Sequence, residues 1–344
     1  MKKRFVPGWI VAVVLTALFA AACGAPAPSR EAMIEDVLQN REDVVIVVTD
    51  SGLGGLSVAA ELAARLPESG IFRRARIVFY NALFHDIGYN GLESEAEKAR
   101  IFDAVLKAMD KRYRPDLLLI ACNTLSVVYE NTKFSRRAPF PVVGILEAGV
   151  DLIADQFEKT PEAMAVVFAT RTTIASEAHK NRLVARGIPA GRIVGQACHL
   201  LAGAIERGPE SEETSALIRQ FVGEALEKAG DSSRPIFGSF NCTHYGYARE
   251  TFAAAFAEAG VPDIELLDPN PRMIDFMFRL PYLHRFLKTD VEVKVVSKLK
   301  ITEDERAAIG PLIAAVSPAA AEALDEYRLD PELFKVRFKP PDSK

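Results

Sequence analysis

Short β-branched runs alternate with longer amphipathic segments over most of this chain of 344 residues. The apolar runs lie at 44–48, 75–80, 117–121, 141–146, 165–169, 192–195, 234–240 and 263–267. Helix-like stretches lie between them, for example at 56–66, 95–112 and 247–260. Because a helix that links two neighbouring strands makes those strands parallel, the alternation predicts an α/β fold with mainly parallel sheets flanked by helices.

Four of the predicted strand ends carry small polar side chains. Their sequences are TDSGLGG at 49–55, CNT at 122–124, ATRTT at 169–173 and NCTH at 241–244. In open α/β sheets, ligands bind beyond the carboxyl ends of the strands. These four segments are therefore the first place to look for a functional site.

The first of these segments places Asp50 and Ser51 before glycines that lead into a helix. Glycine permits positive φ angles and a close approach of the backbone to a ligand, and helix-start N–H groups favour an anion such as a carboxylate. A tight turn in which Asp50 or Ser51 accepts backbone hydrogen bonds explains the segment equally well. It is not a phosphate loop, because no Gly-Lys-Ser/Thr follows.

Two other strand ends repeat one pattern, Cys-Asn-Thr at 122–124 and Asn-Cys-Thr-His at 241–244. A cysteine at a strand end is most often a small buried hydrophobe, but the repeat suggests two half-sites that face each other. The closely spaced Cys/His pairs of a zinc site are absent, so we expect no metal. The Gly-x-Ser-x-Gly elbow of a serine hydrolase is absent as well.

Two thiols on opposite sides of one cleft can invert the configuration of a carbon atom. If Cys122 and Cys242 face each other, one thiolate removes a proton and the other thiol delivers one to the opposite face. A thiol has a pKa of about 8.5 and must be partly ionised to act as a base at neutral pH. Asp50 and His244 are the candidates for assisting these proton transfers.

The polar segments together resemble those of glutamate racemase, in the cofactor-independent aspartate/glutamate racemase superfamily. DSGLGGLS, ACNT, PVVGILEAGV, ATRTTIAS and CTHY carry the resemblance, in this order, from about residue 44 to about residue 275. It implies two pseudosymmetric α/β domains, an acidic amino acid in the cleft between them, and no cofactor. Cys122 and Cys242 match the two catalytic bases, and Asp50 and His244 match their auxiliary groups. The positions that match substrate-binding residues are Asp50, Ser51, Tyr89, Asn123, Thr124, Thr170, Thr173 and Thr243.

The order of the segments also implies the domain boundaries. The first domain comprises 43–143 plus 245–284, the second comprises 144–244, and 285–344 forms a C-terminal extension of unknown role. Within the extension, the run at 290–301 is typical of strands. Thr302 with Glu305 predicts a capping box at the start of a helix.

The chain departs from the family pattern at three places near the expected substrate. The family's Pro-Tyr-Gly loop reads Ile-Gly-Tyr-Asn at 87–90, which retains Tyr89. Asn241 replaces a glycine before the second cysteine, and Gly246 replaces a proline. Two alternatives to a glutamate racemase therefore stay open: an aspartate or broad-specificity racemase, and an inactive amino-acid-binding lipoprotein.

The first 22 residues are typical of an export signal. Basic residues at 2–4 precede an uncharged run at 9–22, which is shorter than the roughly 18–20 residues of a membrane span. Cys23 follows in FAAAC, which resembles a lipoprotein cleavage box, so we expect lipidation of Cys23. Residues 23–42 are then a tether and an N-terminal helix, and the protein is periplasmic or membrane-anchored. Simple secretion and an uncleaved anchor are the alternatives.

Charge and family together indicate the partners. The 42 basic and 46 acidic residues are scattered without long runs of one sign, which argues against a nucleic-acid partner. We expect a small amino acid and, through the lipid anchor, a membrane. A homodimer is considered, although the sequence does not determine the oligomeric state. Members of the family supply D-glutamate to peptidoglycan synthesis, part of cell wall biogenesis, in the cytoplasm. Export of this chain conflicts with that role.

Overall fold

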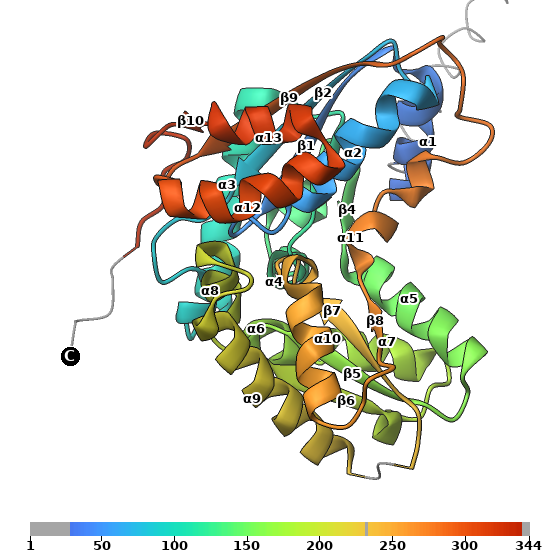
Figure 1. Ribbon diagram of the computed structural model, residues 1–344. Helices are drawn as coiled ribbons and strands as arrows, with labels where there is room; N and C mark the ends of the chain where they lie inside the picture. The colour runs from blue at the N-terminus through green and yellow to red at the C-terminus, as the bar shows by residue number, and fades with distance from the viewer. Residues whose placement is uncertain (1–27, 231–232, 339–344) are drawn as a thin grey trace, which may run out of the picture.

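Two parallel sheets flanked by helices make up the computed structural model, which describes residues 28–230 and 233–338 (Figure 1). Sheet A has the strand order β10-β9-β2-β1-β3-β4 and sheet B the order β6-β5-β7-β8. Every strand pair in both sheets is parallel. The predicted α/β fold class is confirmed.

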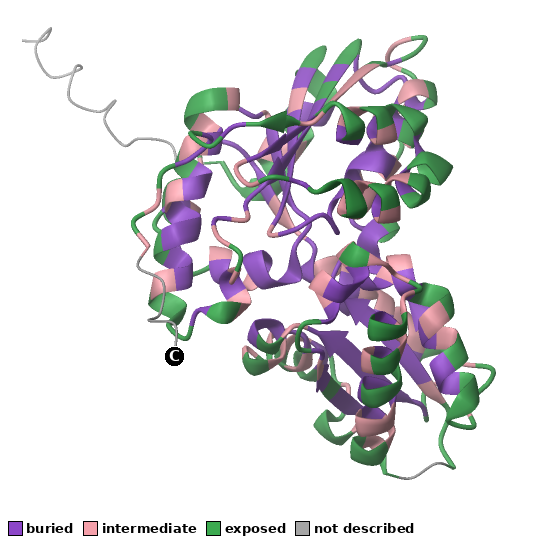
Figure 2. Cartoon of the chain, turned by 60° about the vertical axis from the view of Figure 1, so that its left-hand side comes forward, coloured by how far each residue is buried: buried purple, intermediate pink, exposed green. Residues whose placement is uncertain are grey.

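Each of the eight predicted strands is present, with small differences at the ends. Sheet A consists of β1 (Asp43–Asp50), β2 (Arg74–Asn81), β3 (Leu117–Ile120), β4 (Val142–Gly144), β9 (Asp290–Ser297) and β10 (Arg328–Leu329). Sheet B consists of β5 (Met164–Ala169), β6 (Ile193–Ala197), β7 (Ile236–Asn241) and β8 (Glu265–Leu267). The strands are buried between helices, as Figure 2 shows for both sheets, and this explains why they read as continuous apolar runs.

Helices connect the strands and cover both faces of each sheet. Those before β5 are α1 (Arg30–Asn40), α2 (Leu56–Ser69), α3 (Glu95–Tyr113), α4 (Asn123–Tyr129) and α5 (Leu146–Lys159). Those from β5 to β8 are α6 (Arg171–Ala175), α7 (Ala178–Ala185), α8 (Leu201–Arg207), α9 (Glu212–Ala229) and α10 (Arg249–Glu258). The last are α11 (Pro269–Arg272), α12 (Glu303–Val316) and α13 (Pro318–Asp325). The expected N-terminal helix is α1, which Ser29 caps by accepting a hydrogen bond from the Ala32 N–H.

Alternation along β1 shows how sheet A is sandwiched. Ile46 and Val48 point into a core that includes α2, whereas Val47 points into a second core that includes α3. Helices therefore cover both faces of sheet A, and the polar carboxyl ends of its strands lie at the edge of the sheet that borders the candidate site.

The C-terminal extension completes sheet A. Strand β9 pairs with β2 along its whole length, from Arg74 opposite Asp290 to Asn81 opposite Ser297. The predicted capping box is present, because Thr302 and Glu305 each accept a backbone hydrogen bond from the other residue. Helices α12 and α13 then pack on α2, and their apolar residues join its core.

Strand pairing corrects one predicted domain boundary. Residues 245–284 were expected in the first domain, but β8 pairs with β7 in sheet B. Helix α10 links these two neighbouring parallel strands, so it packs on the sheet that they belong to. Only the end of this range returns to sheet A, where Met273, Ile274 and Met277 enter the core.

The predicted export signal at 1–22 and the lipidation site Cys23 lie outside the described residues. Within 28–230 and 233–338, no helix combines the length and apolar character needed to span a bilayer.

Candidate functional site

The four polar strand ends converge on one cavity of about 180 Å³ between the two sheets. The ends of β1 and β3 reach it from sheet A, and the end of β7 reaches it from sheet B. Predicted site residues that line it are Asp50, Ser51, Tyr89, Cys122, Asn123, Thr124, Thr170, Cys242, Thr243 and His244. The predicted site in an interdomain cleft is therefore present as a cavity, and a thiol from each sheet contributes to its wall.

Cys122 occupies the turn between β3 and α4. Its Sγ lies 3.3 Å from the Ser51 hydroxyl and accepts a long hydrogen bond of 3.5 Å from the Leu125 N–H at the start of α4. Burial raises the pKa of the Cys122 thiol well above its usual range, and the nearby Asp50 carboxylate raises it further. The Cys122 environment consequently favours the protonated thiol, which is the form that donates a proton.

Asp50 stands at the junction of the two sheets. Its Oδ2 accepts a hydrogen bond of 2.6 Å from the Thr243 hydroxyl, and its Oδ1 accepts one of 2.6 Å from the Ser51 N–H. Burial raises the pKa of Asp50, while the charge on His244 and the Thr243 hydroxyl oppose the rise without cancelling it. A carboxyl group with a raised pKa next to a thiol can exchange protons with it.

Cys242 belongs to a chain of three side chains that ends on Glu206. The Cys242 Sγ lies 3.6 Å from His244 Nδ1, and His244 Nε2 lies 2.6 Å from Glu206 Oε1. Burial by itself lowers the pKa of His244, but the Glu206 carboxylate outweighs it and holds the pKa well above its usual range. Burial raises the pKa of the Glu206 carboxyl group, but the positive charge on His244 outweighs burial, and the net pKa is lowered. The pair is therefore an imidazolium beside a carboxylate.

This assignment decides between two contacts at one nitrogen atom. The Gly54 N–H also lies 3.1 Å from His244 Nε2 and would donate to a neutral ring. A protonated ring has no lone pair at Nε2, so Nε2 donates to Glu206 and Nδ1 donates toward Cys242. The imidazolium therefore faces the Cys242 sulfur at 3.6 Å, an arrangement suited to a group that removes a proton.

Several buried polar atoms at the cavity have no hydrogen-bond partner among the described residues. They are both amide atoms of Asn123, the hydroxyl of Tyr89 and the side-chain oxygen of Asn241. Buried polar groups in proteins are nearly always paired, so these atoms are available to a polar ligand. Asn123 offers a donor and an acceptor immediately beside Cys122, where a bound molecule would present its reacting carbon.

Comparison with known proteins agrees with this geometry. The family model described as Asp/Glu/Hydantoin racemase matches residues 46–233, a range that includes Asp50 and Cys122 and ends before β7 and Cys242. The chain belongs to the Asp/Glu/Hydantoin racemase family.

Similar proteins and structures cover most of the chain. The glutamate racemase of Syntrophus aciditrophicus is 30% identical over 262 residues, which are 72% of this chain and 88% of that protein. That of Herpetosiphon aurantiacus is 32% identical over 234 residues, 66% of this chain and 80% of that protein. The crystal structure of glutamate racemase isoform RacE1 from Bacillus anthracis aligns with a TM-score of 0.62 at 18% identity, over 80% of this chain and 95% of that one. The Francisella tularensis enzyme in complex with D-glutamate aligns with a TM-score of 0.59 at 22% identity and the same coverage.

Two of the departures from the family pattern are accommodated by packing in this family member. The Asn241 side chain donates to the Ser239 hydroxyl at 3.0 Å, and a Cβ atom on Gly149 would lie 2.3 Å from its Oδ1. A Cβ atom on Gly246 would lie 2.3 Å from Asp268 Oδ2, so only glycine fits there. Glycine at these two positions leaves the space that the neighbouring polar side chains occupy.

The glycines after Asp50 serve close approach. A Cβ atom on Gly54 would lie 2.3 Å from the Thr243 hydroxyl and 2.6 Å from His244 Nδ1. None of the glycines at 52–55 has a positive φ angle, so of the two properties of glycine considered above only the close approach is used here. The segment needs glycine because the strand end of sheet B packs directly against its backbone.

Threonines join the two sheets beside the cavity. The hydroxyls of Thr124 and Thr170 lie 2.7 Å apart. The Thr172 N–H donates to Asn90 Oδ1 at 3.3 Å, and Lys98 Nζ donates to the Thr172 hydroxyl at 3.0 Å. These contacts hold the start of α6 against Asn90, α3 and α4, which follow the strands of sheet A.

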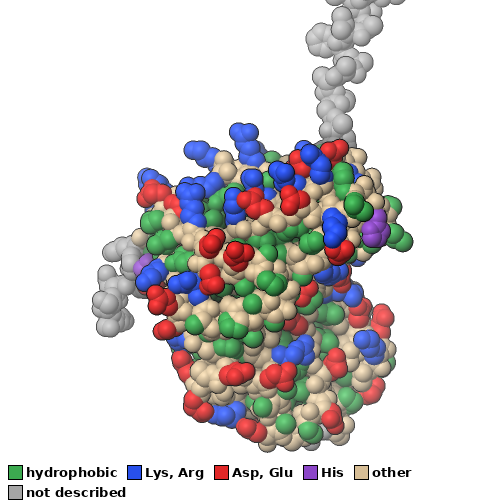
Figure 3. All heavy atoms as spheres, turned by 45° about the horizontal axis from the view of Figure 1, so that its top comes forward, with side chains coloured by type: hydrophobic (Ala, Val, Ile, Leu, Met, Phe, Trp, Pro, Cys, Tyr) green, Lys and Arg blue, Asp and Glu red, His purple; other side chains and the backbone are tan. Residues whose placement is uncertain are grey.

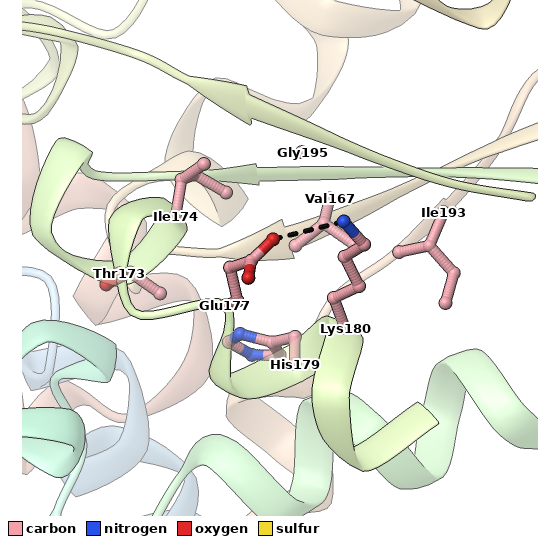
Figure 4. Close-up of a pocket in the computed structure, with 8 residues that line it drawn as sticks. All are labelled: Val167, Thr173, Ile174, Glu177, His179, Lys180, Ile193 and Gly195. Carbon is pink, nitrogen blue, oxygen red and sulfur yellow. Dashed lines mark hydrogen bonds and ion pairs between the residues drawn. The ribbon is translucent and has the colours of Figure 1, made fainter. Parts of the chain in front are cut away.

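Thr173 is the one predicted site residue outside the lining of this cavity. Its hydroxyl lies 3.0 Å from that of Thr170, so it supports the lining from behind. It faces instead a separate cavity of about 210 Å³ under β5 and β6, whose rim carries the ion pair of Glu177 and Lys180 at 3.0 Å (Figure 4).

Glu206 is the functional residue that the sequence did not reveal. It lies on α8 in the sequence GAIERG, which matches no catalytic motif, and charged residues of surface helices are ordinarily solvated. An acidic residue directly after an apolar turn was the available signal, and it is a weak one. The three described cysteines, Cys122, Cys198 and Cys242, are unpaired. Among the described residues, no three His, Cys, Asp or Glu side chains are grouped as metal ligands would be.

Proposed function

We propose that the protein is a glutamate racemase that uses Cys122 and Cys242 as its two acid–base groups. The observation that carries the proposal is that two buried thiols from different sheets line one cavity, Cys122 beside Asp50 and Cys242 beside His244. The 30% identity to proteins named glutamate racemase supports glutamate as the substrate. No described contact favours aspartate, a broader set of amino acids, or a pocket that binds without turnover.

The residues divide the work of one turnover. Starting from one enantiomer, the Cys242 thiolate, stabilised by the His244 imidazolium, removes the α-proton of the bound amino acid. The electron pair left on carbon is protonated on the opposite face by the Cys122 thiol. The product leaves with inverted configuration, and Cys122 is now the thiolate and Cys242 the thiol. In the reverse direction Cys122 removes the proton, and Asp50 can accept the proton of the Cys122 thiol beforehand.

Proton exchange with solvent tests this mechanism directly. The purified protein, without added cofactor, is incubated with L-glutamate or D-glutamate in deuterated water. We expect loss of the α-proton signal by NMR and formation of the other enantiomer by chiral chromatography. Cys122→Ala and Cys242→Ala should each abolish racemisation, whereas Cys198→Ala, which removes a thiol outside the cavity, should retain it. Full activity in either cavity variant would refute the assignment.

A panel of acidic and neutral amino acids tests the substrate. We expect glutamate to have the highest kcat/KM, since relatives that are 30% and 32% identical to this chain are named glutamate racemase. A higher value for aspartate would instead assign the altered 87–90 loop to a change of specificity.

Export and lipidation at Cys23 are also part of this proposal. The basic residues at 2–4, the apolar run at 9–22 and the FAAAC sequence support them. Mass spectrometry of the mature N-terminus is the test: a lipid-modified Cys23 is expected, and an intact Met1 would return the protein to the cytoplasm. Light scattering on the same preparation tests the homodimer.

A further inference from the structure

The segment from Arg279 to Thr289, which leads into β9, presents two leucines to solvent. Leu280 is 82% exposed and Leu287 is 96% exposed, and they are the most exposed large apolar side chains among the described residues. Between them, Tyr282 and Leu283 pack on the core of sheet A and hold the segment in place. A surface that displays leucines from an anchored segment has apolar area to offer a partner.

The charge of the same segment narrows the choice of partner. It contains Arg279, Arg285 and Lys288 and no acidic residue. Lys288 pairs with the exposed Glu68 at 3.3 Å, but within the described chain neither arginine has a carboxylate within ion-pair distance. Figure 3 shows further Lys and Arg side chains, with Asp and Glu among them, across the upper part of the molecule. Leucine interleaved with basic residues is the composition of segments that lie in the interface of an anionic membrane.

The start of the described chain lies beside this segment. Arg285 donates to the carbonyl oxygens of Leu38 at 2.6 Å and Arg41 at 3.0 Å at the end of α1. Arg30, at the beginning of α1, lines one cavity together with Arg279. Figure 1 shows α1 and this segment side by side at the same corner of the molecule.

The length of the tether places that corner near the proposed anchor. Six peptide units join Cys23 to Ser29, the residue that caps α1. A fully extended chain spans at most about 3.3–3.6 Å per residue, so a lipid on Cys23 would hold the start of α1 within about 20 Å of the bilayer.

We propose that Leu280 and Leu287 insert into the interface of the membrane that holds the anchor, with Arg279 and Lys288 against its headgroups, while Arg285 holds the segment to the end of α1. The inference rests on the proposed lipidation of Cys23. It gives the enzyme a fixed orientation, with sheet A toward the bilayer and sheet B away from it. The cavity between the sheets then receives its substrate from the aqueous side.

Depth-dependent quenching tests this orientation. The full chain, purified with its native N-terminus, carries Leu287→Cys labelled with an environment-sensitive dye; the other described thiols are buried and react slowly. It is added to vesicles of phosphatidylethanolamine and phosphatidylglycerol that contain a spin-labelled lipid. The control is Val184→Cys, which is 42% exposed on α7 beside sheet B. We expect the label at 287 to lose most of its fluorescence and the label at 184 to keep it.

Flotation of the vesicles separates the two proposals. Protein that floats but shows no quenching at 287, or equal quenching at both positions, overturns the docking of this segment and leaves the anchor intact. Protein that does not float overturns the anchor and the docking together. Racemase activity measured in the same samples reports on the proposed reaction independently of both.

Discussion

Replacing Glu206 with glutamine isolates the role of its charge in the Cys242–His244–Glu206 chain. The amide has nearly the same shape and still accepts a hydrogen bond from His244 Nε2, which lies 2.6 Å from Glu206 Oε1. What disappears is the negative charge that holds the pKa of His244 above its usual range. Burial is then opposed only by the contacts with Cys242, so the pKa of His244 falls and the ring loses its proton at lower pH than in the unmodified protein.

The structure sets the size of the expected effect. Two unit charges about 4 Å apart interact by about 4 kcal/mol at the effective dielectric constant of about 20 that suits protein sites. The His244 Nδ1 lies 3.6 Å from the Cys242 Sγ, so loss of the imidazolium charge removes an interaction of this order from the thiolate. Since about 1.36 kcal/mol corresponds to a tenfold change in rate, the upper limit is about a thousandfold. We expect kcat to fall by about 10²–10³-fold, within the usual range for general acid–base groups.

The pH profile distinguishes this reasoning from simple damage to the site. Below the pKa of His244 the imidazolium is present, and it is lost as the pH rises through that pKa. In Glu206→Gln the alkaline fall in kcat should therefore begin at lower pH, with little change in KM. Glu213→Gln, which removes an exposed carboxylate paired with Arg207, is the matched control. Wild-type kcat and an unmoved alkaline limb in Glu206→Gln would refute the role of the charge.

Three further predictions follow from the packing and the charges. Gly54→Ala should destabilise the fold by about 1–3 kcal/mol in thermal unfolding and reduce activity, since its Cβ would lie 2.3 Å from the buried Thr243 hydroxyl. Gly191→Ala, which has open space around its Cβ, should change neither the stability nor the activity. Ile313→Ala on α12 should cost about 2–5 kcal/mol in urea unfolding, and Leu312→Ala on the same helix should cost much less, because only Ile313 is buried. The lowered pKa of Glu206 contributes stability that is present above its unfolded-state pKa and is lost as the pH falls through its folded-state pKa. Acid unfolding followed by circular dichroism should accordingly be less steep in Glu206→Gln, and an unchanged acid limb would contradict the assigned ion pair.

Local sequence predicts the position of the site better than it predicts the charges within the site. Asp50, Cys122 and Cys242 could be predicted as neighbours because each follows an apolar strand, and the carboxyl ends of parallel strands share an edge. The pairing of β9 with β2 could not be predicted in the same way. A run such as 290–297 specifies an extended backbone, but its partner strand is chosen by packing with segments more than two hundred residues away.

Sequence alone determined the alternation of strands and helices, the polar strand ends and the two thiol half-sites, because each depends on residues within a few positions of one another. Tertiary structure decided that Glu206 meets His244, that β8 belongs to sheet B, and that Arg279 lines one cavity with Arg30 at the start of α1. These contacts join residues that are distant along the chain. Burial then determines whether a carboxylate there is an ordinary solvated group or the group that keeps a histidine charged.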